Sequence, residues 1–244
     1  MLSKKVLKDI QSLSAKKQRR EQGLFLAEGP KIAAELVALM PARVVGIYAT
    51  QPWIDRNGNL PSSVQSVVEP VTETELQRIS QLQTPNEVVL VARQQEAAEP
   101  VAGPGITLYL DTIQDPGNFG TIVRIADWFG VRDIVCSGGC ADLYNPKVVQ
   151  STMGSIARVN VWYDEEETWL DRQRVPVLAA ALDGVPLSAV GRPERAILLI
   201  GNEGKGLRPG LLARAASTLT IPRVGDAESL NAAVATGIIL SHLT

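Results

Sequence analysis

Two apolar segments near the carboxyl terminus each stop at a glycine-rich or polar turn, and this pattern constrains the fold more than any other feature. Residues 197–200 are followed by Gly-Asn-Glu-Gly-Lys-Gly-Leu at 201–207, and residues 219–221 by a polar stretch that closes at 229–231 with Ser-Leu-Asn. Continuous apolar runs of this length are typical of strands buried in a parallel sheet. Because the carboxyl ends of such strands build ligand sites, we expect a small-molecule pocket there.

A third segment earlier in the chain is organised in the same way. We expect a strand at residues 108–111. The turn Asp-Pro-Gly-Asn-Phe-Gly at 115–120 then leads into an expected helix at 121–126. The three segments resemble the three motifs of the SpoU (TrmH-like) RNA ribose 2'-O-methyltransferases, of the SPOUT superfamily. The matching patterns are Asn118-x-Gly120-x-x-x-Arg124-x-Ala126, Gly201-Asn202-Glu203-Gly204-x-Gly206-Leu207, and Ile221-Pro222 to Ser229-Leu230-Asn231.

Length and composition describe an ordinary globular protein. The 244 residues are 45% hydrophobic and 20% charged, which suits one large domain or two modest ones. We expect neither a membrane span nor a signal peptide, because no long apolar run occurs. Cys136, Cys140 and the single histidine, His242, cannot supply the usual four zinc ligands, so no metal is expected. A reducing, cytoplasmic location is the default for two isolated thiols.

Positive charge is concentrated at the amino terminus. The net charge is −2, but residues 1–20 carry +6 and the remainder −8. Such a segment is either a solvated helix face or an arm that neutralises RNA phosphates. Beside motifs typical of RNA modification, we favour the arm. Its expected RNA-contacting residues are Lys16, Lys17, Arg19 and Arg20.

The chain divides at a stretch rich in proline and glycine, which we take as a linker over 96–105. Upstream, in a domain of residues 1–95, we expect a basic helix, a helix at 30–39, and strands at 24–27, 44–48, 64–68 and 88–92. The sequence Phe-Leu-Ala-Glu-Gly-Pro-Lys at 25–31 resembles the start of the substrate-binding domain of the SpoU family, which is similar to ribosomal L30e-like proteins.

Downstream, residues 106–244 predict an α/β domain with a mostly parallel sheet covered on both faces. The expected strands are 106–111, 133–136, 158–163, 177–181, 196–200 and 217–221. The resemblance further implies that the carboxyl-terminal segment is tied as a trefoil knot, a feature that general folding rules disfavour.

The glycine-rich loop at 201–207 does not match the common phosphate-binding patterns. A P-loop requires Gly-Lys-Ser/Thr, whereas Gly206 is followed by Leu207 and Arg208. The dinucleotide fingerprint fails because Gly210 falls one position late. Glycine in this turn permits positive φ and close approach of the backbone to a ligand. Taken alone, the loop favours the structural interpretation, a helix C-cap or a simple strand–helix turn.

The resemblance implies that this pocket binds S-adenosylmethionine, chiefly through main-chain and packing contacts. The residues it assigns to the cofactor are Ala181, Leu182, Ile200, Gly201, Asn202, Gly206, Ile221, Ser229 and Leu230.

The resemblance also implies catalytic residues, each of which has a structural alternative. The family assigns Arg124 to activating the ribose hydroxyl. Because a guanidinium stays protonated, we favour a role in anchoring the RNA phosphate and stabilising the developing alkoxide. The structural alternative is an ordinary surface arginine. Asn118 is expected to cap the helix and also to join the catalytic site. Glu203 orients Arg124 or lies at a helix start as a capping carboxylate. Ser229 and Asn231 complete the set.

Two further segments bear on partners. The loop at 145–155 resembles a family loop in which a basic residue often stands at Gln150, and Lys147 is either an RNA phosphate contact or a solvated lysine. Arg223 also departs from the pattern, at a position that is usually apolar. The apolar helix at 232–241 requires burial, which makes His242 a packing residue, and the family uses this helix in a homodimer.

The sequence therefore predicts an RNA methyltransferase that acts on a ribose 2'-oxygen of rRNA or tRNA. Two other functions compete with it. One is a non-catalytic RNA-binding protein that retains the cofactor pocket, and the other is a nucleotide-dependent enzyme of Rossmann type. Neither the RNA nor the modified nucleotide follows from the sequence.

Overall fold

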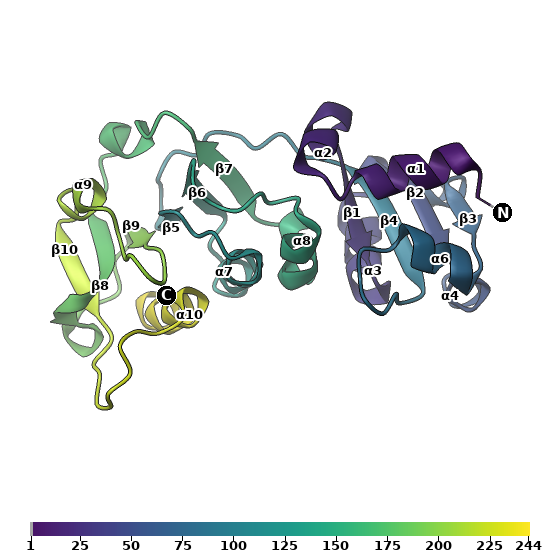
Figure 1. The fold of residues 1–244 in the computed structure, drawn as a ribbon. Coiled ribbons are helices and arrows are strands. Elements are labelled where there is room, and N and C mark those ends of the chain that lie inside the picture. The colour runs from purple at the N-terminus through teal and green to yellow at the C-terminus, as the bar shows by residue number, and fades with distance from the viewer. Residues whose placement is uncertain (1) are drawn as a thin grey trace. The chain divides into compact units, whose positions relative to one another are not determined.

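The computed structural model describes residues 2–244, which divide into two compact units (Figure 1). Unit 1 consists of the chain up to Glu96 together with Asp142–Ala157. Unit 2 consists of Ala97–Ala141 and Arg158–Thr244. No helix within residues 2–244 is both long and apolar enough to cross a membrane.

Unit 1 is built around a four-stranded sheet of order β1-β4-β2-β3, in which β4 runs antiparallel to β1 and β2 while β3 runs parallel to β2. Its elements are α1 (Lys4–Ser12), α2 (Lys16–Gln22), β1 (Leu24–Glu28), α3 (Pro30–Leu39), η1 (Pro41–Arg43), β2 (Val44–Ala49), α4 (Gln51–Arg56), α5 (Ser62–Gln65), β3 (Val68–Pro70), α6 (Glu73–Ile79), β4 (Val88–Arg93), α8 (Pro146–Thr152) and η2 (Ser155–Ala157).

Helices α1 and α6 pack on one face of this sheet. Ile10 and Leu13 at the α1 end and Leu76 and Ile79 of α6 join one apolar cluster with strand residues such as Val91. Local signals fix the helix ends: Ser3 caps α1, and Thr72 and Glu75 form a reciprocal capping box at the start of α6. The amide of Leu2 also donates to Glu75 over 2.7 Å, which ties the two helices together.

One expected strand of this unit was wrong. Residues 64–68 do not form a strand; Ser62–Gln65 is a short helix, and the strand is Val68–Pro70. Pro61 precedes the first helical residue, and the amides of Val64 and Gln65 both donate to its carbonyl, so a turn forms where apolar content alone suggested extended chain. Helix 30–39 and the other three strands agree with expectation to within a residue or so.

The segment 142–157 folds with unit 1, although we expected the second domain to be continuous from 106. Tyr144 lies against Phe25 with ring centroids 4.8 Å apart. The turn at Gly154 approaches Glu35 of α3 so closely that an added Cβ would lie 2.7 Å from the Glu35 Cβ. Sequence order did not indicate this exchange, because the segment is flanked on both sides by strands of unit 2.

Arg19 connects this segment to the amino-terminal helices. Its guanidinium donates to the carbonyls of Leu13 (3.0 Å) and Ser14 (2.7 Å) and pairs with the carboxylate of Asp142 at 2.5 Å. The side chain is 2% exposed. The arginine is therefore a buried structural group, which charge counting along the sequence could not show.

Unit 2 contains a six-stranded, fully parallel sheet of order β10-β8-β9-β5-β6-β7, which confirms the predicted α/β fold with a parallel sheet. Its elements are β5 (Gly105–Leu110), α7 (Pro116–Trp128), β6 (Asp133–Ser137), β7 (Asn160–Asp164), η3 (Trp169–Arg172), β8 (Val177–Pro186), η4 (Leu187–Ala189), β9 (Arg195–Ile200), α9 (Pro209–Leu212), β10 (Ser217–Thr220) and α10 (Ala232–Leu243). The trefoil knot is not tested by strand order and stays a prediction.

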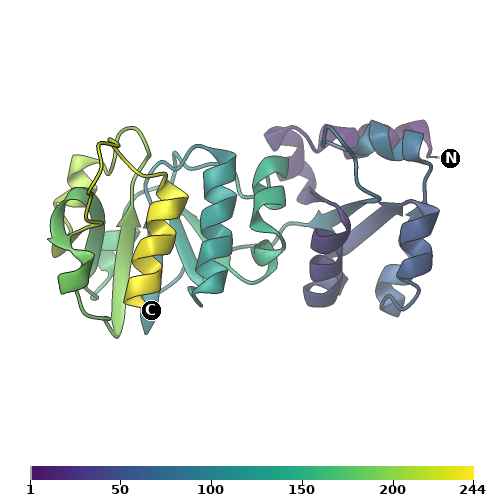
Figure 2. The ribbon, with the colours of Figure 1, turned by 90° about the horizontal axis from the view of Figure 1, so that it is seen from below.

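Both faces of this sheet are covered. Helices α7 and α10 lie side by side on one face (Figure 2). On the other face, Trp169 and Leu211 pack against Tyr109, Ile197 and Leu199 of the central strands. His242 lies near the end of α10 and its Nε2 is 2.7 Å from the carbonyl oxygen of Val190, a contact consistent with packing.

The stretch expected to be a linker is fastened to unit 2. The indole of Trp169 donates to the carbonyl of Pro100 over 2.6 Å, Asn160 donates to Ala98, and Arg172 pairs with Glu99 at 2.7 Å. Proline and glycine thus mark an irregular segment with a fixed path rather than a free tether.

Replacing Arg19 with alanine should destabilise unit 1 by about 3 kcal/mol, because it leaves the Asp142 carboxylate and two carbonyls unpaired. Hydrogen–deuterium exchange read by mass spectrometry should then speed up in peptides covering 13–28 and 142–152. The control is Arg20→Ala, which removes the neighbouring exposed charge and should shift exchange little. Equal protection in both variants would contradict the structural role of Arg19.

Candidate active site

Three of four adjacent parallel strands lead, at their carboxyl ends, into the loops that carry the sequence motifs. Leu110, the last residue of β5, lies in register with Ile200, the last residue of β9, and β8 separates β9 from β10. The chain leaves β5 toward α7, leaves β9 into the loop 201–208, and leaves β10 toward α10. The three motifs therefore emerge at one edge of the sheet, all within unit 2.

A chain of side-chain hydrogen bonds links the three motifs. The amide nitrogen of Asn118 donates to Glu203 Oε1 over 2.5 Å. The amide nitrogen of Asn231 donates to Asn118 Oδ1 over 2.8 Å. One residue from each motif thus contributes to a continuous polar row, as the predicted site requires.

Helix capping accounts for the placement of two of these residues. Asn231 caps α10, since its Oδ1 accepts from the amides of Ala233 (2.9 Å) and Val234 (3.2 Å). Asn118 does not cap α7, because Asp115 holds that position and accepts from the Asn118 amide over 2.8 Å. The capping role expected for Asn118 was therefore wrong, and its side chain contacts the other two motifs instead.

The loop after β9 closes tightly on itself and requires glycine. An added Cβ at Gly201 would lie 2.4 Å from the carbonyl carbon of Gly206 and from the amide nitrogen of Leu207. Gly206 has φ of +67°, a conformation that favours glycine. Asn202 holds the turn: its Oδ1 accepts from the amides at 204 (3.0 Å) and 205 (3.1 Å), and its Nδ2 donates to the carbonyl of Thr112 over 2.9 Å.

The end of this loop is fixed by a charged cluster that sequence reasoning missed. Asp111 is fully buried at the end of β5 and accepts from the amide of Arg208 (2.9 Å) and from its Nε (2.7 Å). The same guanidinium also pairs with Glu167 at 2.9 Å. The hydrogen bond to Glu167, together with the charge of Asp111, raises the pKa of Arg208, so its guanidinium stays protonated. In the sequence, the only indication of this cluster is an acidic residue at the end of an apolar strand.

The loop before α10 leaves its main chain open. Among the described residues, no main-chain group from 222 to 230 forms a hydrogen bond with another main-chain group. Leu230 is 46% exposed and Ser229 is exposed without joining the polar row. Beside this loop, the hydroxyl of Thr220 donates to the carbonyl of Leu182 over 2.8 Å, so the irregular part of β8 that contains Ala181 and Leu182 adjoins the end of β10.

Arg124 is exposed in the second half of α7, because that helix begins at Pro116 rather than near 121. It does not contact Glu203, whose carboxylate is paired with Asn118. Within residues 2–244 no hydrogen bond or ion pair holds the guanidinium. The expected orientation of Arg124 by Glu203 is thus not observed in this conformation.

The residues expected to contact RNA lie in unit 1. Lys16, Lys17, Arg20 and Lys147 are exposed, and Lys17 pairs weakly with Glu21 at 3.8 Å. Arg19 is the exception, because its guanidinium is buried and paired with Asp142. Its expected contact with RNA is corrected to a structural role.

Both parts of the chain match families of known proteins. Residues 105–241 match the SpoU rRNA Methylase family, and residues 4–90 match an MRM3-like substrate binding domain. A curated relative, the 23S rRNA (guanosine(2553)-2'-O)-methyltransferase RlmP of Bacillus subtilis, is 32% identical over 241 residues, covering 97% of this chain and 95% of that protein.

Two solved structures are similar along the whole chain. A TrmH-family protein from Porphyromonas gingivalis has a TM-score of 0.88 at 37% identity, covering 100% of this chain and 98% of that one. An AdoMet-bound rRNA methyltransferase from Sinorhizobium meliloti has a TM-score of 0.87 at 29% identity, covering 100% and 95%. With the three motifs joined at one sheet edge and a family match over more than half its length, this chain belongs to the SpoU rRNA methylase family.

Proposed function

We propose that this protein transfers the methyl group of S-adenosylmethionine to a ribose 2'-oxygen of rRNA or tRNA. The observation that carries the proposal is the hydrogen-bonded row Glu203–Asn118–Asn231, which joins the three motifs at the edge of a parallel sheet. A non-catalytic RNA-binding protein would have no need for a polar row beside the cofactor loops. A Rossmann-type nucleotide enzyme would need phosphate-binding signatures that the loop 201–207 lacks.

The residues at this edge fit the cofactor. Gly201 packs against 206–207 without room for a side chain, so a ligand there meets main-chain groups. The main chain of 222–230 forms no internal backbone hydrogen bonds, although the Ala227 carbonyl accepts from Arg223 over 3.2 Å, and Leu230 offers apolar surface. Such a combination suits an adenosine held by backbone hydrogen bonds and packing. Ile200, Asn202, Gly206, Ile221, Ala181 and Leu182 would complete the site.

The chemistry requires a hydroxyl held in line with the methyl donor and relieved of its proton. S-adenosylmethionine supplies the electrophilic methyl group when bound. Arg124 would hold the RNA phosphate bidentately and stabilise the developing alkoxide. Asn118, Asn231 and Glu203 would orient the nucleotide, and the exposed Ser229 would add a hydrogen bond.

RNA would be held by unit 1, whose sequence matches a substrate binding domain. The exposed Lys16, Lys17, Arg20 and Lys147 provide charge for phosphate contacts. Cys136 and Cys140 are free and buried, which suits the reducing cytoplasm in which we place the protein.

A homodimer would cover apolar surface on α7 and α10. Trp128 is 82% exposed, Val234 50% and Ile238 38%, on two helices that lie side by side (Figure 2). Val234 and Ile238 are four residues apart and share one helix face. Large apolar side chains exposed together mark an interaction surface, and Arg124 of α7 is exposed near them, so a second subunit would complete its surroundings.

The proposal is tested by titrating S-adenosylmethionine into the full chain by calorimetry and then measuring incorporation of labelled methyl groups into bulk rRNA and tRNA. Binding followed by incorporation at ribose 2'-oxygens supports it. Binding without incorporation favours the RNA-binding alternative. Competition by ATP or NAD for the same pocket would instead support a nucleotide-dependent enzyme.

Gly201→Ala should abolish measurable cofactor binding, because the new Cβ would collide with the main chain at 206–207 and open the loop. Calorimetry would measure the change. Gly210→Ala is the control, since nothing lies within 4 Å of a Cβ at that position. If Gly201→Ala bound the cofactor as the wild type does, the loop would not be part of the pocket.

Arg124→Ala should lower the rate of methyl transfer roughly 100- to 1,000-fold, the usual loss when one charge-stabilising donor is removed. Cofactor affinity should change little, because the residue is assigned to the RNA. Single-turnover assays and calorimetry would separate the two quantities. The control Arg132→Ala removes an exposed charge just before β6, at the opposite sheet edge. A loss of cofactor binding in Arg124→Ala would refute the assignment.

Light scattering after size-exclusion chromatography should give about twice the 26.2 kDa of the single chain. Trp128→Glu should shift that mass toward the monomer, because it places a charge in the proposed interface. Val101→Glu, at an apolar residue that is 83% exposed away from these helices, should not. A monomeric wild type would exclude the homodimer.

A further inference from the structure

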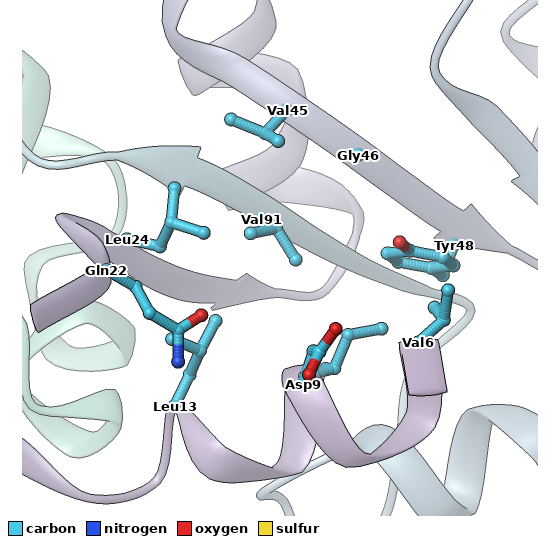
Figure 3. A pocket seen from close by; sticks show the side chains of 10 residues that line it. Val6, Asp9, Leu13, Gln22, Leu24, Val45, Gly46, Tyr48 and Val91 are labelled. Carbon is cyan, nitrogen blue, oxygen red and sulfur yellow. The ribbon is translucent and has the colours of Figure 1, made fainter. Parts of the chain in front are cut away.

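A small pocket in unit 1 lies between α1 and the sheet. It is lined by Val6, Asp9, Ile10, Leu13, Gln22, Leu24, Val45, Gly46, Tyr48 and Val91. Figure 3 shows Tyr48 and Val6 at one end, Leu13 and Leu24 at the other, and Val91 between them. From this geometry we propose that the pocket binds a single unstacked nucleobase of the RNA substrate; this inference rests on the proposed function.

The size of the cavity restricts its occupant. Its volume is about 120 Å³, well below the roughly 300–1,000 Å³ of pockets that enclose a whole cofactor or drug-sized ligand. It nevertheless exceeds the share of one water molecule, roughly 30 Å³. One planar ring system is therefore the appropriate scale of ligand.

The walls suit a flat aromatic ligand. Tyr48 is half-buried, and its ring lies across Gly46 on the same strand, so closely that a Cβ at Gly46 would be 3.1 Å from the ring. The missing side chain at Gly46 thus lets the phenol lie along the sheet. Val45, which precedes Gly46 and also lines the pocket, is 37% exposed, so this part of the pocket wall reaches the surface. RNA-binding proteins hold unstacked bases on such aromatic platforms.

Polar groups stand where the edge of a base would need them. Asp9 and Gln22 are exposed at the rim, and Gln22 donates to the Ser12 hydroxyl over 3.0 Å, which holds its amide near α1. A carboxylate accepts from base amino groups, and an amide both donates and accepts. Burial together with the charges of Glu69 and Asp9 raises the pKa of Tyr48, so its phenol stays neutral.

Charge and family context favour RNA over a protein side chain as the occupant. Lys5 lies four residues before Asp9 and therefore on the same side of α1, while Lys16 and Lys17 begin α2, the helix that contains Gln22. These cations would hold the backbone on either side of an inserted base. The pocket also falls almost entirely within 4–90, the part of the chain that matches a substrate binding domain.

Tyr48→Leu tests the pocket in the full-length protein, with a fluorescein-labelled single-stranded RNA of mixed sequence as the probe. Loss of one stacking contact should weaken binding roughly 5- to 150-fold, without changing the slope of affinity against salt. Tyr48→Phe keeps the ring and should bind like the wild type. Replacing Lys16 and Lys17 with alanine should instead reduce the salt slope. Equal affinity of Tyr48→Leu and the wild type would overturn the proposal.

Cross-linking gives a second measurement that does not depend on the stability of a variant. Ultraviolet irradiation of the wild-type complex, followed by mass spectrometry, should place an RNA adduct on Tyr48. Adducts confined to other residues would overturn the pocket. A wild type that neither binds nor methylates RNA would refute the proposed function itself, whereas an active wild type with an indifferent Tyr48→Leu variant would refute only the pocket.

Discussion

The side-chain amide of Asn118 is the point at which the three motifs meet. An amide has one donating and one accepting end, and Asn118 uses them in opposite directions, toward Glu203 and from Asn231. An aspartate could not donate to Glu203, and an apolar residue would leave both partners unpaired in a half-buried site. The contacts span 85 and 113 residues, so this amide holds together segments that the chain itself leaves far apart.

Around this point, backbone and side chains have separate tasks. The tight turn at Gly201 and the irregular main chain of 222–230 present backbone groups. Backbone groups are independent of side-chain identity, which suits the binding of one fixed cofactor. The polar row, in contrast, is made of side chains alone. The pair between the buried Asp111 and the partly exposed Arg208 fixes the far end of the glycine loop to the neighbouring strand, so the loop cannot relax without breaking a charged contact.

The sequence predicted the strands of unit 2 and the convergence of its motifs because both depend on local signals: apolar runs, and the turns that end them. Contacts between distant charged residues carry no such signal. Arg19 and Arg20 are neighbours in one basic stretch, yet one is buried and the other exposed. Likewise, the sequence around Asn118 does not show whether this residue or Asp115 caps the helix, and only the structure assigns the cap to Asp115.

The segment 142–157 makes unit 1 discontinuous along the chain. It leaves the strand order of unit 2 between β6 and β7 and folds with unit 1, so the chain crosses between the units three times rather than once. Gln95 and Tyr144, which both belong to unit 1 and lie next to two of these crossings, share two hydrogen bonds. Side-chain contacts as well as chain connectivity therefore assign 142–157 to unit 1, although strands of unit 2 flank this segment on both sides.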